Sequence, residues 1–337
     1  MIRVGVIGLG SMGQTHIGAY LNTPGVKVVA IADNNPDRLS GKVKVGGNVE
    51  GQGKGGLDHS TVKQYNEGMQ LIADPDIDLI DICLHTPLHL EYALAALKAG
   101  KHLLVEKPLA RTAADAQKLV EAAASAKGIS MCAMCMRFWP GWTWLKDVVD
   151  SRQYGKVLSA KFRRVASHPG GPFYTNGDAC GGAALDLHIH DTDFIQYVFG
   201  KPQAVSSAGY AKHTTAIDHI VTRYQYADIP MVVAEGGWSM ADGFGFRMQY
   251  TINFEKATAI FDIGAKDQLL LVENGTTQAV PLDPKMGYDY EIAYLVDCIN
   301  NNRKPTTVTL ASAALSVKIV EAEVESIKQN GAYVKID

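Results

Sequence analysis

The sequence predicts a chain of two domains: an α/β domain with a parallel sheet, followed by an α+β domain built on a large, mainly antiparallel, open sheet. The chain has 337 residues, which exceeds the usual size of a single hydrophobic core. Strands and helices alternate up to about residue 136, as they do in a parallel sheet with helices on both faces. Strands then follow one another with short connections, as they do in an antiparallel sheet.

Five buried strands are expected in the first part of the chain, because each is a short apolar run bounded by turn residues. They are residues 3–7, 26–32, 78–84, 102–105 and 129–136. The helices between them are expected at 12–21, 88–99 and 113–126. Gly100 fits the position just after the second of these helices. Residues 41–56 contain seven glycines, too many for a regular element, so we expect a mobile surface loop there.

The second part of the chain contains seven further runs with the composition of strands. They are residues 157–166, 204–211, 219–226, 231–238, 248–253, 258–262 and 269–272. Two helices are expected beside this sheet, near 187–199 and 290–300, and a last helix at 311–329. We therefore predict two domains, residues 1–128 and residues 129–337.

Charge and composition exclude several classes of partner. The net charge of −3 argues against nucleic acid as a partner, because such binders usually carry a basic face. No apolar run approaches the roughly 18–20 residues that cross a membrane, and no signal peptide precedes the first strand, so we expect a soluble cytoplasmic protein. The five cysteines are expected to be buried, reduced thiols. Cys132 and Cys135 form a C-x-x-C pair, but no second pair follows, so no metal site is predicted.

A glycine-rich fingerprint follows the first strand and opens a helix. In Gly8-Leu9-Gly10-Ser11-Met12-Gly13, the first glycine permits a tight turn and the second lets the backbone approach a pyrophosphate. The third allows close packing of helix on strand. The N–H groups at the start of the helix, where Ser11 and Met12 lie, would face the phosphates. This pattern predicts a dinucleotide-binding Rossmann domain.

An acidic residue stands where the ribose of the dinucleotide should lie. Asp33 is twenty residues past Gly13, at the end of the second strand, where a carboxylate accepts hydrogen bonds from ribose hydroxyls. Asn34 and Asn35 follow it, and no arginine is adjacent. A carboxylate repels a 2′-phosphate, and no arginine is expected nearby to neutralise one, so we predict NAD in preference to NADP.

Four further segments carry a resemblance to a known family. They are Thr86-Pro87-Leu88-His89, Glu106-Lys107-Pro108, Arg137-Phe138-Trp139-Pro140 and the stretch from Gly181 to Asp193. Together with the glycine fingerprint they resemble the Gfo/Idh/MocA family of oxidoreductases, which includes inositol dehydrogenases and glucose–fructose oxidoreductase. The resemblance covers nearly the whole chain and extends to Gly287-Tyr288-Asp289-Tyr290-Glu291 and the helix after it. The sequence departs from the family pattern at residues 41–56, where a shorter helical link is usual, and at Glu91, where many members have a second histidine.

The resemblance implies a catalytic group of three residues. Asp186 and His190 are four residues apart and share one helical face, and a carboxylate beside an imidazole raises its proton affinity. The matching histidine of the family accepts the hydroxyl proton, so His190 is assigned this role and Asp186 orients it. Lys107 would lie over the reacting carbon and stabilise a developing alkoxide. With Tyr288, these three residues form the predicted substrate-binding set.

The cofactor contacts are predicted from the same motifs. The expected residues are Gly8, Gly10, Ser11, Met12, Gly13, Asp33, Asn34, Leu84, Thr86, Pro87, His89, Glu106, Lys107, Arg137 and Trp139. The resemblance also implies a cis bond between Lys107 and Pro108. His188 should face away from His190 and pack in the core, so no metal site is predicted there. For Asp193, a structural and a catalytic role both stay open, and Trp142 and Trp144 are expected in the core.

The predicted activity is hydride transfer between NAD and a ring hydroxyl or ketone of a sugar, sugar derivative or cyclitol. Two alternatives stay open: NAD-dependent glycoside cleavage by oxidation and elimination, and a dinucleotide-binding regulator without catalysis. The intact Lys107, Asp186 and His190 argue against the regulator. The large sheet has no following helices to cover its second face, so a homodimer or homotetramer is expected.

Overall fold

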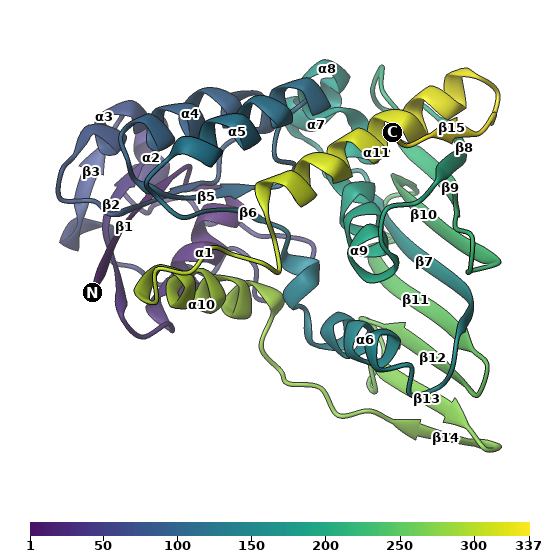
Figure 1. Cartoon of the computed structure of the whole chain (residues 1–337). Coiled ribbons are helices and arrows are strands. Elements are labelled where there is room, and N and C mark those ends of the chain that lie inside the picture. The colour runs from purple at the N-terminus through teal and green to yellow at the C-terminus, as the bar shows by residue number, and fades with distance from the viewer. The chain divides into compact units, whose positions relative to one another are not determined.

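The computed structural model describes all 337 residues and divides them into two compact units (Figure 1). The first unit contains Met1–Phe138 and Met286–Ala314, and the second contains Trp139–Lys285 and Leu315–Asp337. The predicted boundary at 128/129 differs from this division, because the strand after residue 129 pairs with the first sheet. A later segment also returns to the first unit.

The first unit is built on a six-stranded sheet in which every pair of strands is parallel. The strands are β1 (Ile2–Ile7), β2 (Val26–Ala32), β3 (Lys63–Tyr65), β4 (Leu79–Ile82), β5 (His102–Glu106) and β6 (Ser130–Ala133). Their order is β3-β2-β1-β4-β5-β6. The strand order therefore reverses between β1 and β4, where open α/β sheets bind ligands at their carboxyl ends.

The predicted helices of this unit are confirmed, and three short elements were missed. The helices are α1 (Ser11–Leu21), α2 (Pro36–Leu39), α3 (Gly68–Ala73), α4 (His89–Lys98), α5 (Ala113–Ser125) and α10 (Gly287–Asn300). The missed elements, α2, α3 and β3, are too short to show a hydrophobic period. The helix near 290–300 was expected beside the second sheet, and this placement is wrong. α10 belongs to the segment that returns to the first unit, where it packs against α1.

Residues 41–56 form no helix or strand, as predicted. The segment is tied down at two neighbouring residues. The backbone N–H of Gly53 donates to the Thr15 hydroxyl at 2.8 Å, and the Gln52 amide donates to the Tyr288 hydroxyl at 2.6 Å. This glycine-rich segment therefore contacts both α1 and α10.

The second unit is built on a nine-stranded sheet that is antiparallel except for the pair β7 and β10. The strands are β7 (Val157–Ser167), β8 (Ala204–Tyr210), β9 (His219–Gln225), β10 (Met231–Met240), β11 (Phe246–Phe254), β12 (Ala257–Asp262), β13 (Leu269–Glu273), β14 (Thr276–Ala279) and β15 (Val334–Lys335). The predicted sheet is confirmed, with β14 and β15 added to it.

Helices cover one face of this second sheet (Figure 1). They are α6 (Pro140–Ser151), α9 (Ile189–Phe199) and the part of α11 (Leu310–Lys328) that lies in this unit, and the sequence prediction missed α6. Trp142 on α6 is fully buried and packs edge-on against Phe194 and Tyr250, with ring centroids 4.7 and 5.5 Å apart. Its predicted place in the core is confirmed, whereas Trp144 is only partly buried. No helix of the chain is long and apolar enough to span a bilayer.

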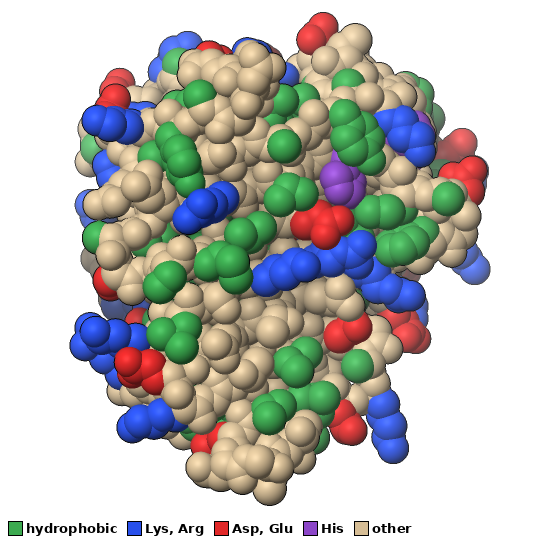
Figure 2. Space-filling model, turned by 90° about the vertical axis from the view of Figure 1, so that its right-hand side faces the viewer, with side chains coloured by type: hydrophobic (Ala, Val, Ile, Leu, Met, Phe, Trp, Pro, Cys, Tyr) green, Lys and Arg blue, Asp and Glu red, His purple; other side chains and the backbone are tan.

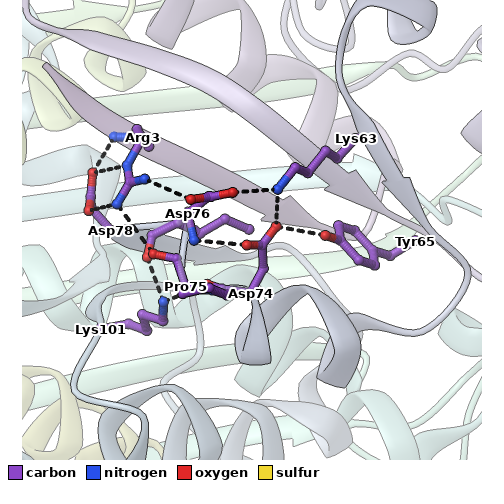
Figure 3. A network of polar contacts seen from close by, with 9 residues as sticks. Arg3, Lys63, Tyr65, Asp74, Pro75, Asp76, Asp78 and Lys101 are labelled. Carbon is purple, nitrogen blue, oxygen red and sulfur yellow. Dashed lines mark hydrogen bonds and ion pairs between the residues drawn. The ribbon is translucent and has the colours of Figure 1, made fainter.

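A network of charged residues ties together the amino-terminal edge of the first sheet (Figure 3). Arg3 at the start of β1 binds Asp78 before β4 at 2.8 Å. Lys63 at the start of β3 binds Asp74 at 2.9 Å, and the Lys101 ammonium donates to the Asp74 carbonyl at 2.7 Å. The network therefore fastens the edge opposite the carboxyl ends of the strands.

Candidate active site

The glycine loop between β1 and α1 has the geometry of a pyrophosphate cradle. A Cβ on Gly8, which has φ +93°, would lie 2.5 Å from the Cys83 carbonyl oxygen, and one on Gly13 would lie 1.9 Å from the Gly8 carbonyl oxygen. Both positions therefore require glycine. A Cβ on Gly10 would meet nothing within 4 Å, so the backbone is open on the side where a phosphate would approach. α1 begins here without a side-chain cap or an acidic residue in its first turn, which suits an anion.

Asp33 is held in place at the end of β2. One carboxylate oxygen accepts the Leu9 N–H at 2.8 Å and the other accepts the Asn35 N–H at 2.8 Å. Lone pairs remain on both oxygens to accept ribose hydroxyls. The Arg38 guanidinium lies 3.9 Å from Asp33, so the expectation that no arginine lies near this carboxylate is wrong. Arg38 is brought close by the short helix α2, which the sequence analysis missed.

The turns after β4 and β5 are joined by one histidine. His89 is buried, and its Nδ1 lies 2.8 Å from the Pro108 carbonyl. Its Nε2 lies 2.9 Å from the Leu84 carbonyl, and burial lowers its pKa. The predicted cis bond between Lys107 and Pro108 is confirmed. His89 therefore connects the backbone of the turns that follow β4 and β5.

Glu106 and Lys107 end β5 at the carboxyl edge of the sheet. The Glu106 side chain is 7% exposed and accepts the backbone N–H of Lys107 at 2.9 Å. Burial opposes ionisation of Glu106, but the contact with His16 and the charges of His16 and Lys107 lower its pKa below the ordinary value. The carboxylate is therefore ionised and directs the peptide of Lys107.

Arg137 and Tyr288 have contacts that the sequence did not reveal. Arg137 is buried, and its guanidinium donates to the Thr307 carbonyl at 2.8 Å and to the Ser312 hydroxyl at 3.1 Å. Tyr288 is 6% exposed, and its hydroxyl is engaged by Gln52. Both residues are thus fastened within the first unit, and no short sequence motif links them to these distant partners.

The other predicted cofactor residues follow the expected elements. Ser11 and Met12 begin α1 and are partly exposed, and Asn34 is exposed just after β2. Leu84, Thr86 and Pro87 follow β4, with Thr86 buried. Trp139 is 7% exposed and precedes α6 in the second unit.

Asp186 and His190 lie on a buried segment of the second unit. From Gly181 to Gln196 every residue is buried except these two, which are partly exposed. A wide π-helical turn, Ala184–His188, precedes α9, and a spacing of four residues is close to one full turn in either kind of helix. The two side chains therefore share one face, as predicted.

Two glycines position this segment. Gly182 has φ +70°, and a Cβ there would lie 2.4 Å from the Ile217 carbonyl oxygen. A Cβ on Gly236 of β10 would lie 2.4 Å from Nδ1 of His188, so the bare backbone of β10 makes room for this ring. His188 is fully buried, and its Nε2 lies 3.2 Å from the Tyr224 hydroxyl.

The acidic residues of α9 lie in the interior. Asp191 forms a buried ion pair with Arg164 at 2.9 Å, and Asp193 accepts a hydrogen bond from the Ser316 hydroxyl at 2.7 Å. The three side chains whose metal-ligand atoms gather within 4.8 Å of one another belong to the first unit: His16, Asp81 and Cys83. They are distinct from the D-x-x-x-H motif.

The matches to family models follow these two units. Residues 2–134 match a model described as an oxidoreductase family with an NAD-binding Rossmann fold, and residues 142–260 match the Gfo/Idh/MocA C-terminal domain. The first unit therefore contains an NAD-binding Rossmann domain. The chain belongs to the Gfo/Idh/MocA family of oxidoreductases, which confirms the resemblance.

Several characterised proteins are similar to this chain. Myo-inositol 2-dehydrogenase of Thermotoga maritima is 33% identical over 203 residues, 59% of this chain and 55% of that protein. Levoglucosan dehydrogenase of Pseudarthrobacter phenanthrenivorans is 30% identical over 221 residues, 61% of this chain and 53% of that protein. The matches thus span about half the length of these relatives. A solved levoglucosan dehydrogenase, in complex with NADH and levoglucosan, aligns with a TM-score of 0.86 and 21% identity over 99% of both chains, which supports the fold.

Proposed function

We propose that this chain is an NAD-dependent oxidoreductase that transfers a hydride between nicotinamide and a ring hydroxyl or ketone of a sugar, sugar derivative or cyclitol. The observation that carries the proposal is the pair Asp186 and His190, the two partly exposed residues of an otherwise buried segment. Their partial exposure leaves both side chains accessible to a bound substrate, as an acid/base pair requires. The names of the inositol and levoglucosan dehydrogenases support the substrate class.

Bound NAD would supply the hydride acceptor, and the residues of the chain would supply the rest. His190 takes the proton of the substrate hydroxyl, and Asp186 stabilises the imidazolium that results. The Lys107 ammonium stabilises the negative charge that develops on the substrate oxygen.

The glycine loop and Asp33 would hold the pyrophosphate and the adenosine ribose of NAD. The open backbone side at Gly10 and the uncapped start of α1 fit the phosphates, and Asp33 keeps acceptor capacity for ribose hydroxyls. The carboxylate of Asp33 would repel a 2′-phosphate, although Arg38 weakens this effect. We therefore propose NAD in preference to NADP.

The deciding experiment is NADH formation from NAD with a panel that contains myo-inositol, other cyclitols, levoglucosan, free sugars and glycosides. We expect turnover with at least one sugar or cyclitol, and loss of it in His190→Ala. Release of an aglycone without net NADH formation would indicate glycoside cleavage instead. NAD binding with no turnover across the panel would refute the dehydrogenase and favour a regulator.

The second sheet supports a proposal about assembly. Its strands carry exposed apolar residues, among them Val221 on β9 and Ile260 on β12. Figure 2 shows hydrophobic side chains on this side of the molecule with Lys and Arg side chains between them. We expect a homodimer or homotetramer that buries this face. Light scattering at micromolar concentration tests this, since a monomeric mass would refute it, and Val221→Glu with Ile260→Glu should dissociate the assembly. Location in the cytoplasm stays a prediction.

A further inference from the structure

A histidine of α1 lies buried between two carboxylates of the first sheet. His16 is fully buried. Its Nδ1 is 2.9 Å from Asp81 on β4, and its Nε2 is 3.1 Å from Glu106 at the end of β5. The Nε2–H does not aim straight at the Glu106 oxygen, so this second contact is an ion pair more than a hydrogen bond. The sequence analysis passed over His16.

The surroundings make this imidazole a cation. Burial opposes the charged form, but the charge of Asp81 and the hydrogen bond to it raise the pKa of His16 well above its ordinary value. A neutral imidazole would leave two carboxylates unbalanced in the interior, which is far more costly than an ion pair. His16 therefore carries a positive charge at neutral pH.

A bound metal ion is a poor alternative explanation for this group. Ligand atoms on one tetrahedral ion with bonds of about 2.0–2.1 Å lie more than 3 Å apart. His16 Nδ1 and Asp81 are 2.9 Å apart, which is the length of a direct hydrogen bond. Burial also raises the pKa of the Cys83 thiol well above its ordinary value, so the sulfur is not a thiolate ligand.

We propose that His16 is a positioning residue for hydride transfer: it holds the Glu106 carboxylate, and Glu106 in turn fixes the backbone of Lys107. The chain of contacts is continuous, since Glu106 meets His16 with one oxygen and accepts the Lys107 N–H with the other. The Lys107 ammonium sits on a flexible stem, so a fixed starting point at the backbone narrows the space that the ammonium can reach. The inference rests on the role proposed above for Lys107.

Kinetics of single and double variants test the coupling, with NAD and the best substrate of the panel. We expect His16→Gln to lower kcat by about 10–100-fold, the scale for a misplaced catalytic group, while KM for NAD stays within about threefold. His16→Gln combined with Lys107→Ala should be no slower than Lys107→Ala alone, because His16 acts through Lys107. His102→Gln is the matched control: His102 lies at the opposite end of β5, where its Nδ1 accepts the Ile129 N–H. It should keep kcat.

A readout without turnover comes from the backbone amide of Lys107. In protein labelled with ¹⁵N-lysine, the Lys107 resonance is identified by its loss in Lys107→Ala. An N–H bound to a carboxylate is strongly polarised, so its proton should resonate downfield and move upfield in His16→Gln. Glu106→Gln should move it in the same direction, and His102→Gln should leave it in place. If His16→Gln does not fold, Glu106→Gln enters both the spectra and the kinetic cycle in its place.

Two outcomes would overturn the inference while the proposed function stands. The first is a double variant, His16→Gln with Lys107→Ala, whose loss in kcat is the product of the two single losses. The second is a Lys107 amide resonance that His16→Gln does not move. Wild-type kcat in Lys107→Ala is a different result, because it removes the role proposed for Lys107 and the inference with it.

Discussion

Glu323 on α11 should make the stability of this protein depend on pH through the neutral range. The residue is fully buried. It accepts a hydrogen bond from the Thr192 hydroxyl at 3.0 Å, and it lies 3.4 Å from Nε2 of His188. Burial raises the pKa of Glu323 from 4.5 to about 8, and burial with the nearby Arg164 lowers the pKa of His188 to about 3. The pair is therefore neutral at pH 7, with the proton on the carboxyl group.

The magnitude follows from the linkage between proton binding and folding. Between pH 4.5 and about 8 the folded chain keeps a proton on Glu323 that the unfolded chain has lost. The stabilisation that comes from proton binding at Glu323 is therefore complete below pH 4.5. It falls as the pH rises and is lost above about pH 8. At about 1.36 kcal/mol for each pH unit, the total loss approaches about 5 kcal/mol. This is an upper limit, because relaxation and water entry lessen the penalty of a buried charge.

The variant Glu323→Gln keeps the shape and cannot ionise. Urea unfolding followed by tryptophan fluorescence, at pH values from 5 to 9, gives the free energy of unfolding of both proteins. We expect the free energy of unfolding of the variant to rise relative to that of the wild type as the pH rises, so that the variant is the more stable protein at pH 9. Glu321→Gln is the control, because Glu321 is an exposed residue of the same helix. Wild-type and Glu323→Gln curves that run parallel over the whole range would show that Glu323 titrates normally.

Three further predictions concern the cofactor, the base and the charged edge. Asp33→Ser with Asn34→Arg should shift the ratio of NADP to NAD affinity by roughly tenfold or more, which is about 1.4 kcal/mol. Fluorescence titration with each cofactor measures it, and an unchanged ratio contradicts the assignment of Asp33. His190→Ala should lower kcat by roughly 10²–10⁴ with NAD affinity unchanged, and Asp186→Asn should move the pH–rate profile to lower pH. A His190→Ala enzyme with more than about a tenth of wild-type kcat would remove His190 from the mechanism. Asp74→Asn should lower the melting temperature at pH 7, because hydrogen bonds from Tyr65 and Lys63 lower the pKa of Asp74. The difference from wild type should vanish as the pH falls well below 4, where the carboxylate protonates in both states, and a difference that persists in acid would refute this origin.

The sequence predicted those parts of the fold that have a local physical signal. β2 was placed at its observed bounds because Val26–Ala32 is apolar apart from Lys27. The glycine loop was recognised because each glycine has its own steric reason. α6 was missed although Pro140 stands at its first turn, a signal of helix starts. β14 was missed because all four of its residues are exposed, so it shows no apolar alternation.

The sequence predicted which residues form the candidate site, but it did not predict the side chains that hold those residues in place. Lys107, Asp186 and His190 could be named from motifs of a few residues. The side chains that hold such residues come from far along the chain, as Gln52 does for Tyr288 and His16 for Glu106. No periodic pattern in the sequence indicates these pairs, because they form only when the strands and helices pack.

The late return of α10 to the first unit has a consequence for how the protein is made. The ribosome releases Met1–Phe138 first. The chain then makes the whole second sheet apart from β15, and only afterwards α10, which packs on α1, and Thr307, whose carbonyl accepts Arg137. Until these residues are made, one side of α1 in the nascent dinucleotide-binding domain is uncovered, and the Arg137 guanidinium lacks its acceptor, the Thr307 carbonyl. Domains commonly fold in the order of their synthesis. In this chain the second unit should begin to fold while the first is still incomplete, and a ribosome that stalls before residue 307 would release an open, aggregation-prone intermediate.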